Sequence, residues 1–451
     1  MKAIRLCVRA NNGYCSITQA GGLKGTISIP GDKSIAHRCI IAASISQGRV
    51  QLENFPASVD CFSTLRAFQK LGIRIKQKKL NQLIVSGKGL RGLKKPHGPI
   101  FLGDSGTSAR LLLGVLAAQP FKATLRAGKS LSQRPMLRVT EPLRLMGAQI
   151  VARSPSPAAA QEEYLPIAIR GGRLKPITYQ MRVASAQVKS AILLAGLYAD
   201  GITAVIEPLK TRDHTERLLK LFKADIKIKG KSIFIKGSRE LKAPKKVYIP
   251  GDISSASFFI ALASIVPCSE ITIKNVGLNP TRTGAIKVLK RMGANILVSG
   301  MRGAGSFEPM GEVVVRTSSL KGTRVKKEEI PSLIDELPIL MVAACKAVGR
   351  TVFEGVGELR VKETDRIKSM SDNLKKMGAN IRITKNRREE CVIIKGVKVL
   401  RGTKVRSFGD HRTAMSMIVA GLSACGRTLI DDVACINKSF PGFLAQLRKL
   451  L

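Results

Sequence analysis

The sequence predicts an α/β (α+β) protein of two domains, each built from three β-α-β-α-β-β repeats around buried parallel helices. Three observations lead to this fold class: the chain length, a pattern that recurs about every 75 residues, and helices without a polar face. A chain of 451 residues exceeds what a single hydrophobic core usually serves, so two domains are expected. A period of about 75 residues is too long for a solenoid repeat and suits a module of two helices and four strands.

The recurring pattern is an amphipathic helix that ends in a bulky apolar residue, then Gly-Ala or a near equivalent, then a β-branched strand. It occurs at residues 65–75, 143–151, 218–228, 288–298 and 374–383. In the third copy Lys223 replaces the glycine. The helix expected at 440–451 is followed by no strand, so we expect a strand at 25–29 to complete the sixth module.

Each module also contains an earlier helix that opens with polar residues and then continues with apolar residues on nearly every side. The six openings are at residues 31–34, 103–108, 184–187, 251–255, 334–337 and 408–412. Because a helix without a polar face has to be buried, we predict six central helices. Their polar openings should lie at the exposed ends of these buried elements.

The boundaries of the two domains are predicted from a repeated tetrapeptide. Ile29-Pro30-Gly31-Asp32 is echoed by Ile249-Pro250-Gly251-Asp252, and each stands before a set of three modules. Proline favours an extended residue before it, and glycine permits unusual backbone angles after it. We therefore predict domain I as 1–29 plus 250–451, domain II as 30–249, and hinge crossings near 29–31 and 248–251.

The first helix opening has the composition of an anion site. Lys33, Ser34 and Arg38 follow Gly31-Asp32 at a helix start, where unpaired N–H groups and the positive end of the helix dipole already favour anions. The alternative is an ordinary capped helix, with Asp32 or Ser34 as the N-cap and the basic side chains in solvent. The recurrence of similar openings favours the anion site.

Two later stretches also bring charges together. In 358–367, Lys362 and Arg366 are four residues apart with Glu363 between them, so the two cations could share one helix face. The alternative for this stretch is an exposed helix start with salt bridges. In 408–412, His411 stands between Asp410 and Arg412 before a buried helix, a place that suits a functional imidazole. The alternative is a structural histidine, the commoner role of a lone imidazole.

The formal net charge is +45, from 76 Lys and Arg against 31 Asp and Glu. A charge of this size raises the alternative that the chain is a nucleic-acid-binding protein. The basic residues are spread over many short groups, and the aromatic residues on which bases could stack make up only 4%. We therefore expect weak, non-specific attraction to phosphate groups and no specific nucleic-acid partner.

Other classes of protein are excluded by simple counts. No apolar run approaches the roughly 20 residues that span a bilayer, and the N-terminal residues lack the continuous apolar segment of a signal peptide. The nine cysteines are scattered without a Cys-x-x-Cys pair, and the four histidines are not spaced as metal ligands. These features predict a cytoplasmic protein without disulfides, a metal site or a membrane partner.

Taken together, the motifs resemble those of the 5-enolpyruvylshikimate-3-phosphate synthase family, in order and from near residue 20 to the end of the chain. The stretches that carry this resemblance are GDKSIAHR, GDSGTSAR, SLSQRPM, ASAQVKSAILLAGL, TRDHTE, PGDISSASF, IDELPI, LRVKETDRI, FGDHR and NKSFPGF. Asp104-Ser105, Ala186 and TRDHTE are similar to the second sequence class of that family.

The resemblance implies the enolpyruvyl-transferase fold, with two similar domains that close over the substrates. It implies that the enolpyruvyl group of phosphoenolpyruvate is transferred to the 5-hydroxyl of shikimate 3-phosphate, on the route to chorismate and the aromatic amino acids. The reaction is an addition followed by an elimination that releases phosphate. The resemblance implies no cofactor and a monomer.

The resemblance also implies site residues. Those implied for shikimate 3-phosphate are Lys33, Ser34, Arg38, Ser185, Ala186, Gln187, Arg212, Asp335 and Lys362. Those implied for phosphoenolpyruvate are Lys33, Gly106, Thr107, Arg134, Gln187, Arg366, Arg412 and Lys438, with Arg110 beside them. The implied catalytic residues are Lys33, Asp335, Glu363 and His411. Glu363 is the candidate that protonates C3, but residue types alone do not assign each proton to Lys33, Asp335 or Glu363.

The nearest alternative is the sister enzyme that transfers enolpyruvyl to UDP-N-acetylglucosamine. That enzyme has Lys-Asn in the first motif and usually a reactive cysteine in the loop before Arg-Pro. Here Ser34 follows Lys33, and residues 128–136 contain no cysteine. A phosphorylated acceptor also suits Arg212 and Ser185 better than a uridine does, so shikimate 3-phosphate is the expected acceptor.

Overall fold

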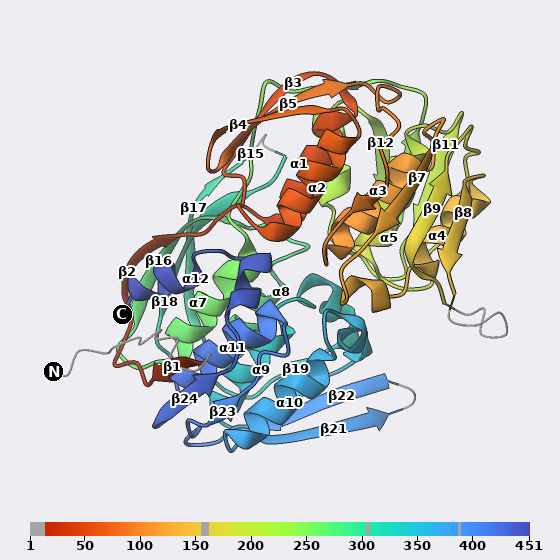
Figure 1. The fold of residues 1–451 in the computed structure, drawn as a ribbon. Coiled ribbons are helices and arrows are strands. Elements are labelled where there is room, and N and C mark those ends of the chain that lie inside the picture. The colour runs from red at the N-terminus through yellow and green to blue at the C-terminus, as the bar shows by residue number, and fades with distance from the viewer. Residues whose placement is uncertain (1–13, 155–161, 304–306, 387–388) are drawn as a thin grey trace. The chain divides into compact units, whose positions relative to one another are not determined.

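The structure is a computed structural model that describes residues 14–154, 162–303, 307–386 and 389–451. The chain divides into two compact units (Figure 1). The inserted unit is Gly31–Ile249, and the discontinuous unit consists of the described residues up to Pro30 together with Pro250–Leu451.

The inserted unit holds three sheets, in each of which a short strand runs parallel to a longer strand that continues into an antiparallel pair. The first sheet has the order β14 (Leu241–Lys242), β3 (Ser46–Glu53), β5 (Gln82–Lys88) and β4 (Arg74–Lys79), with β15 (Lys246–Tyr248) also paired to β3. The second has the order β6 (Ile100–Phe101), β7 (Lys122–Arg126), β9 (Tyr164–Arg170) and β8 (Gln149–Arg153). The third has the order β10 (Thr178–Gln180), β11 (Ile202–Ile206), β13 (Ser232–Lys236) and β12 (Asp225–Lys229).

The discontinuous unit repeats this arrangement in its described residues. Its first sheet has the order β17 (Asn295–Arg302), β18 (Met310–Arg316), β16 (Glu270–Gly277) and β2 (Lys24–Ser28). Its second has the order β19 (Arg324–Val325), β20 (Arg350–Phe353), β22 (Glu389–Lys395) and β21 (Asn380–Asn386). Its third has the order β1 (Cys15–Thr18), β24 (Arg427–Ile430) and β23 (Lys404–Val405). The α/β class and the predicted module are thus confirmed.

The prediction that residues 25–29 complete the sixth module is wrong. Strand β2 pairs in parallel with β16, which places it in the fourth module, with Ile27 opposite Ile273. The sixth sheet is instead extended by β1, antiparallel to β24 with Cys15 opposite Ile430. The physical reason is that β2 is the short first strand of the fourth module, and the whole inserted unit separates it from the helix that follows in that module.

The six central helices are buried as predicted. In the inserted unit they are α1 (Lys33–Ser44), α3 (Gly106–Leu116) and α5 (Ala186–Gly196). In the discontinuous unit they are α7 (Ile253–Ile265), α9 (Leu337–Lys346) and α11 (His411–Leu422). All 13 residues of α7 are buried, as the lack of a polar face requires. Helices α3 and α5 pack backbone to backbone, since a Cβ on Gly114 would lie 2.3 Å from the carbonyl oxygen of Ala191 (Figure 1).

The amphipathic helices cover the outside of these cores, and the helix–strand pairs expected from the repeat are present. They are α2 (Val59–Lys70), α4 (Leu137–Leu145), α6 (His214–Leu221), α8 (Gly284–Arg291) and α10 (Arg366–Lys376). A short helix, α12 (Phe443–Arg448), packs its Phe443 ring 5.2 Å from that of Phe259 in α7. None of the helices in the described residues is both long enough and apolar enough to span a membrane.

Lys223 occupies a left-handed turn position that glycine occupies in the other copies. Its φ is 64°, and φ lies between 86° and 106° at Gly72, Gly147, Gly293 and Gly378. A left-handed conformation costs a residue with a Cβ about 1–2 kcal/mol, more than the extra chain entropy that glycine loses on folding, about 0.5–1 kcal/mol. We expect Lys223→Gly to raise the free energy of unfolding in urea by about 0.5–1 kcal/mol.

The matched control for this prediction is Lys220→Gly, three residues earlier within α6. Lys220 lies in the last turn of α6 and has no left-handed backbone to relieve, so the same change should lower the free energy of unfolding, by up to about 1 kcal/mol. A loss of stability in both variants would contradict the expected strain at Lys223.

Candidate active site

The residues predicted for the site form two groups, one in each unit. Lys33 begins α1, whose N-cap is Asp32, with the Asp32 carboxylate accepting from the Ile35 N–H at 2.9 Å. The Lys33 ammonium lies 3.0 Å from Asp60 in the first turn of α2. Its side chain keeps 15% of its surface exposed, so the cation at this helix start is paired and still accessible.

Arg38 links three helices of the inserted unit through its guanidinium. The Nε of Arg38 donates to Thr215 Oγ1 at 2.7 Å in α6, and one terminal nitrogen donates to Ser190 Oγ at 2.8 Å in α5. The other terminal nitrogen donates to the Ser34 carbonyl at 2.9 Å. Arg212 donates to Ser34 Oγ at 3.4 Å. Four predicted residues therefore lie together near the start of α1: Lys33, Ser34, Arg38 and Arg212.

Two further guanidinium groups converge on the N-terminus of α3. A Cβ on Gly106 would lie 2.9 Å from a terminal nitrogen of Arg134 and 3.1 Å from one of Arg110, so glycine is what lets both groups approach the helix start. Arg110 donates to Gln187 Oε1 at 2.6 Å, and Gln187 donates to Thr107 Oγ1 at 2.9 Å. Two guanidinium groups beside a helix N-terminus form a place suited to a phosphate or carboxylate.

Ser185 and Ala186 stand at the opening of α5, next to Gln187. Ser185 is the N-cap, and its Oγ accepts from the Val188 N–H at 3.4 Å. Ala186 is the first residue of the helix and is half-buried. The structure thus brings the predicted residues of α1, α3 and α5 to the openings of these three buried helices.

A chain of buried hydroxyl groups behind these openings was missed by the sequence analysis. His37 Nδ1 lies 2.7 Å from Thr64 Oγ1, which lies 2.7 Å from Ser108 Oγ, which donates to Ser105 Oγ at 2.7 Å. It joins α1, α2 and α3. Burial, followed by the charges of Lys33 and Arg38, lowers the pKa of His37 well below 6.5.

The lowered pKa of His37 predicts an acid-dependent loss of stability. Below about pH 6.5 the unfolded chain binds a proton at His37 that the folded protein does not, so the free energy of unfolding falls by about 1.4 kcal/mol per pH unit through this group. We expect His37→Gln to make the slope of that free energy, from urea unfolding between about pH 6.5 and about pH 5, shallower by this amount. The control is His97→Gln, which removes an exposed imidazole, so the difference in slope between the two variants isolates the buried His37. Equal slopes in all three proteins would show that His37 takes up its proton without unfolding.

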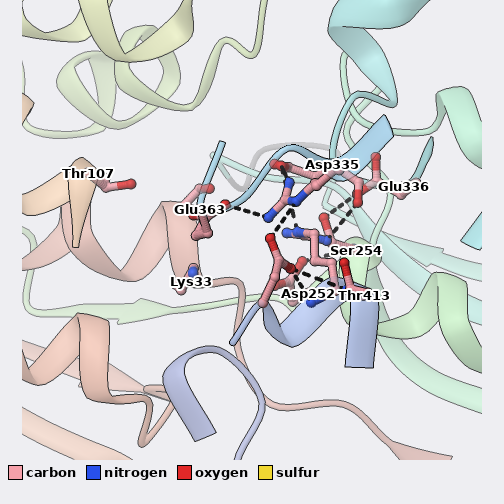
Figure 2. Close-up of polar contacts among 12 residues, drawn as sticks. Lys33, Thr107, Asp252, Ser254, Asp335, Glu336, Glu363 and Thr413 are labelled. Carbon is pink, nitrogen blue, oxygen red and sulfur yellow. Dashed lines mark hydrogen bonds and ion pairs between the residues drawn. The ribbon is translucent and has the colours of Figure 1, made fainter. Parts of the chain in front are cut away.

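The group in the discontinuous unit is centred on Arg366, the first residue of α10. Its side chain is 1% exposed, and it donates to Asp410 at 2.9 Å, to Glu363 at 2.5 Å and to Asp335 at 3.4 Å (Figure 2). Burial by itself would lower the pKa of Arg366, but the three carboxylates outweigh it and raise this pKa. The guanidinium therefore remains charged, with three acidic partners around it.

Arg412 and Lys438 lie beside this cluster. Arg412 donates to the Asp335 carbonyl at 3.0 Å, and its Nε lies 3.7 Å from the Asp335 carboxylate. Lys438, the last residue of a 3-10 helix at Ala434–Lys438, donates to the Gly409 carbonyl at 3.4 Å. His411 is the first residue of α11 and is 2% exposed.

Lys362 is half-buried, and the expectation that it shares a helix face with Arg366 is wrong. Lys362 follows a 3-10 helix at Gly357–Val361, and α10 begins only at Arg366 behind its N-cap Asp365. The capping carboxylate accepts from the Lys368 N–H at 3.0 Å, so the helix cannot extend back to Lys362. The alternative, an exposed start with salt bridges, is found at Arg360. Its side chain is 40% exposed and pairs with Asp365 and Glu390.

A second buried cluster of the discontinuous unit was also missed. Arg282, 2% exposed, donates to Ser254 Oγ at 2.7 Å and lies 3.4 Å from Asp252, the N-cap of α7. Ser254 also donates to Glu336, which precedes α9 (Figure 2). Among the described residues, no group of three or more His, Cys, Asp and Glu side chains is arranged to hold a metal ion.

Comparison with known proteins agrees with the motifs that these two groups contain. Residues 17–447 match the family model described as EPSP synthase (3-phosphoshikimate 1-carboxyvinyltransferase). The chain belongs to the EPSP synthase family. It is 47% identical over 436 residues to the 3-phosphoshikimate 1-carboxyvinyltransferase of Geobacillus thermodenitrificans, covering 96% of this chain and 98% of that relative. The corresponding protein of Desulforamulus reducens is 45% identical over 429 residues, covering 95% of this chain and 97% of the relative.

Solved structures are similar over the same extent. An EPSP synthase from Acinetobacter baumannii is 40% identical, with a TM-score of 0.83 and 97% of both chains covered. The enolpyruvyl transferase NikO from Streptomyces tendae is 18% identical, with a TM-score of 0.74 and 96% of both chains covered, a likeness of fold alone. The predicted family and the enolpyruvyl-transferase fold are confirmed.

Proposed function

We propose that this member of the EPSP synthase family is a 3-phosphoshikimate 1-carboxyvinyltransferase. It transfers the enolpyruvyl group of phosphoenolpyruvate to the 5-hydroxyl of shikimate 3-phosphate and releases inorganic phosphate, on the route to chorismate and the aromatic amino acids. The observation that carries the proposal is the pair of cationic groups at helix openings, around Lys33, Arg134 and Arg212 in one unit and around Arg366 and Arg412 in the other. The two substrates bring two phosphates and two carboxylates to be neutralised.

In this reaction the 5-hydroxyl oxygen forms a bond to C2 of phosphoenolpyruvate while C3 takes up a proton. The tetrahedral adduct then loses a proton from C3 and its phosphate, which restores the double bond. We propose Glu363 as the acid for C3, and Lys33 and Asp335 as the groups that exchange the remaining protons. No step consumes a cofactor.

The pairing of Glu363 with Arg366 bears on its role as an acid. The Arg366 guanidinium donates to the Glu363 carboxylate at 2.5 Å, so this carboxyl is held by the cation. An anionic substrate that competes for Arg366 would weaken this pair and release the carboxyl toward the substrate. We therefore propose that binding of phosphoenolpyruvate at Arg366 and Arg412 prepares Glu363 to protonate C3.

The remaining assignments follow the family resemblance. Shikimate 3-phosphate is proposed to contact Lys33, Ser34, Arg38, Ser185, Ala186, Gln187, Arg212, Asp335 and Lys362. Phosphoenolpyruvate is proposed to contact Lys33, Gly106, Thr107, Arg134, Gln187, Arg366, Arg412 and Lys438. His411 supports the second set. The repeated Ile-Pro-Gly-Asp supports the proposal that residues 29–31 and 248–251 act as hinges. The scattered cysteines support a cytoplasmic location, and the family resemblance supports a monomer.

The test is a phosphate-release assay with purified protein, phosphoenolpyruvate and either shikimate 3-phosphate or UDP-N-acetylglucosamine. We expect turnover with shikimate 3-phosphate only. Turnover with the UDP-sugar would favour the sister activity and contradict the proposal. Salt-dependent, sequence-selective binding of nucleic acid without any phosphate release would favour the nucleic-acid alternative.

A further inference from the structure

A buried ion cluster in the inserted unit lies outside the residues assigned above. The Lys189 ammonium, 0% exposed, lies 3.0 Å from Glu207 and 2.6 Å from Glu216. The two carboxylates are 3% and 2% exposed. Lys189 is in α5, Glu207 follows β11, and Glu216 is in the first turn of α6. One ammonium therefore connects three elements inside the core.

The two glutamates hold the two ends of one chain segment, residues 207–216. Glu207 also accepts from the Thr211 N–H at 3.0 Å and from the Thr211 hydroxyl, which fixes the middle of the segment. The residue after Thr211 is Arg212, the cation proposed to bind the phosphorylated acceptor. The backbone on either side of Arg212 is thus tied to Lys189.

The C-terminal end of the segment is held by a second contact, next to the ion pair of Lys189 and Glu216. Ser190, the neighbour of Lys189 in α5, lies 2.6 Å from Thr215 through their hydroxyl oxygens. Arg38 donates to both of these hydroxyls. Consecutive residues of α5 therefore hold consecutive residues of the segment, Thr215 and Glu216, in one register.

An ion cluster is a costly way to fill a core, because three ionisable groups are taken out of water. Apolar side chains of similar volume often stabilise a core as well or better, so stability alone is a weak reason for the cluster. Burial raises the pKa of Glu216, which favours its neutral form and reduces the excess of negative charge around the single ammonium. What the charges and hydrogen bonds add is a single geometry for the segment.

We propose that Lys189 is a positioning residue that sets the place of Arg212 by holding both ends of segment 207–216. The inference rests on the proposed function only where it names the acceptor as the ligand of Arg212. It predicts that Lys189 acts on binding of the acceptor and not on binding of the enolpyruvyl donor.

The first experiment measures steady-state kinetics of Lys189→Met. The KM for shikimate 3-phosphate should rise about tenfold or more, since a misplaced binding group loses much of its contribution. The KM for phosphoenolpyruvate should stay within about twofold of the parent. Where Lys189→Met fails to fold, Lys189→Met combined with Glu207→Gln removes one charge of each sign and should show the same split.

The matched control is Lys231→Met. The Lys231 ammonium donates to the Pro208 carbonyl at 2.8 Å, so it contacts the same segment from the exposed side. Its loss should change neither KM by more than about twofold. An equal rise in the acceptor KM for Lys231→Met would mean that any contact to the segment matters, and would overturn a special role for Lys189.

A double-mutant cycle with Arg212→Met tests whether Lys189 affects the acceptor KM through Arg212. In the Arg212→Met background, Lys189→Met should have little further effect on the KM for shikimate 3-phosphate, because both changes remove the same interaction. Effects that multiply independently would show that Lys189 does not act through Arg212.

Amide hydrogen exchange separates this inference from the proposed function. In Lys189→Met the amides of residues 209–215 should exchange faster, while those of α3 keep their protection. If the parent protein does not turn over shikimate 3-phosphate, the proposed function fails and exchange still tests the positioning. Unchanged protection of residues 209–215 would overturn the positioning role even in an active enzyme.

Discussion

Lys33→Met is expected to lower turnover of phosphoenolpyruvate and shikimate 3-phosphate by about 10³-fold while the protein keeps its fold. Lys33 is the residue proposed to contact both substrates and to move a proton. Its ammonium stands at the N-terminus of α1, where methionine preserves length and apolar packing and removes only the charge and the donors.

The stability of this variant should change little. The pair with Asp60 is part-exposed, and the Asp60 carboxylate that remains lies in the first turn of α2, where the helix dipole favours a negative charge. A loss of about 1 kcal/mol in the free energy of unfolding is therefore expected. The rate of phosphate release at saturating substrates and the unfolding curve in urea measure the two effects separately.

Two control variants isolate the role of the ammonium. Asp60→Asn removes the partner of Lys33 and keeps the lysine, so its rate should stay within about tenfold of the parent. Lys70→Met removes a lysine of α2 that donates to the Pro99 carbonyl at the surface, and its rate should be unchanged. A Lys33→Met enzyme within tenfold of the parent rate would contradict the proposed proton transfer.

The module could be predicted from the sequence because its signals are local. Helices without a polar face indicate burial, and a turn residue followed by a β-branched strand repeats at one spacing. The pairing of the strands is not local. Strand β2 and strand β1 are both short and lie close together in the sequence, and nothing in either one shows which of two distant sheets it extends. The pattern at residues 25–29 therefore predicts a strand but does not identify the module that the strand joins.

The same distinction applies to the candidate site. The cationic residues of the site belong to stretches that resemble the family, so they could be predicted from the sequence. Their partners could not, because a buried Thr64 or Glu207 looks in the sequence like an ordinary polar residue beside an apolar run. Only the packing of several helices shows that each of them meets a cation or an imidazole.

The second large effect is expected at Arg366, whose removal leaves three carboxylates without their shared cation. Arg366→Met should lower the free energy of unfolding by about 3–5 kcal/mol, because Asp410 is 0% exposed and its charge would remain buried. Asp410 is also the N-cap of α11, accepting from the Arg412 N–H at 2.7 Å, so the opening that carries Arg412 should be disturbed as well. Turnover should fall below detection, since two of the cations proposed for phosphoenolpyruvate, Arg366 and Arg412, are affected.

Arg360→Met is the matched control, because Arg360 also pairs with two carboxylates, Asp365 and Glu390, but is 40% exposed. In solvent such pairs contribute little, so this variant should lose at most about 1 kcal/mol and keep its turnover. Arg366→Lys tests the geometry: it restores the positive charge, but an ammonium cannot reproduce the fork that reaches Asp410, Glu363 and Asp335 together. It should recover part of the stability in urea and little of the turnover. Equal losses of stability in Arg366→Met and Arg360→Met would show that burial of the three-carboxylate cluster does not govern this part of the fold.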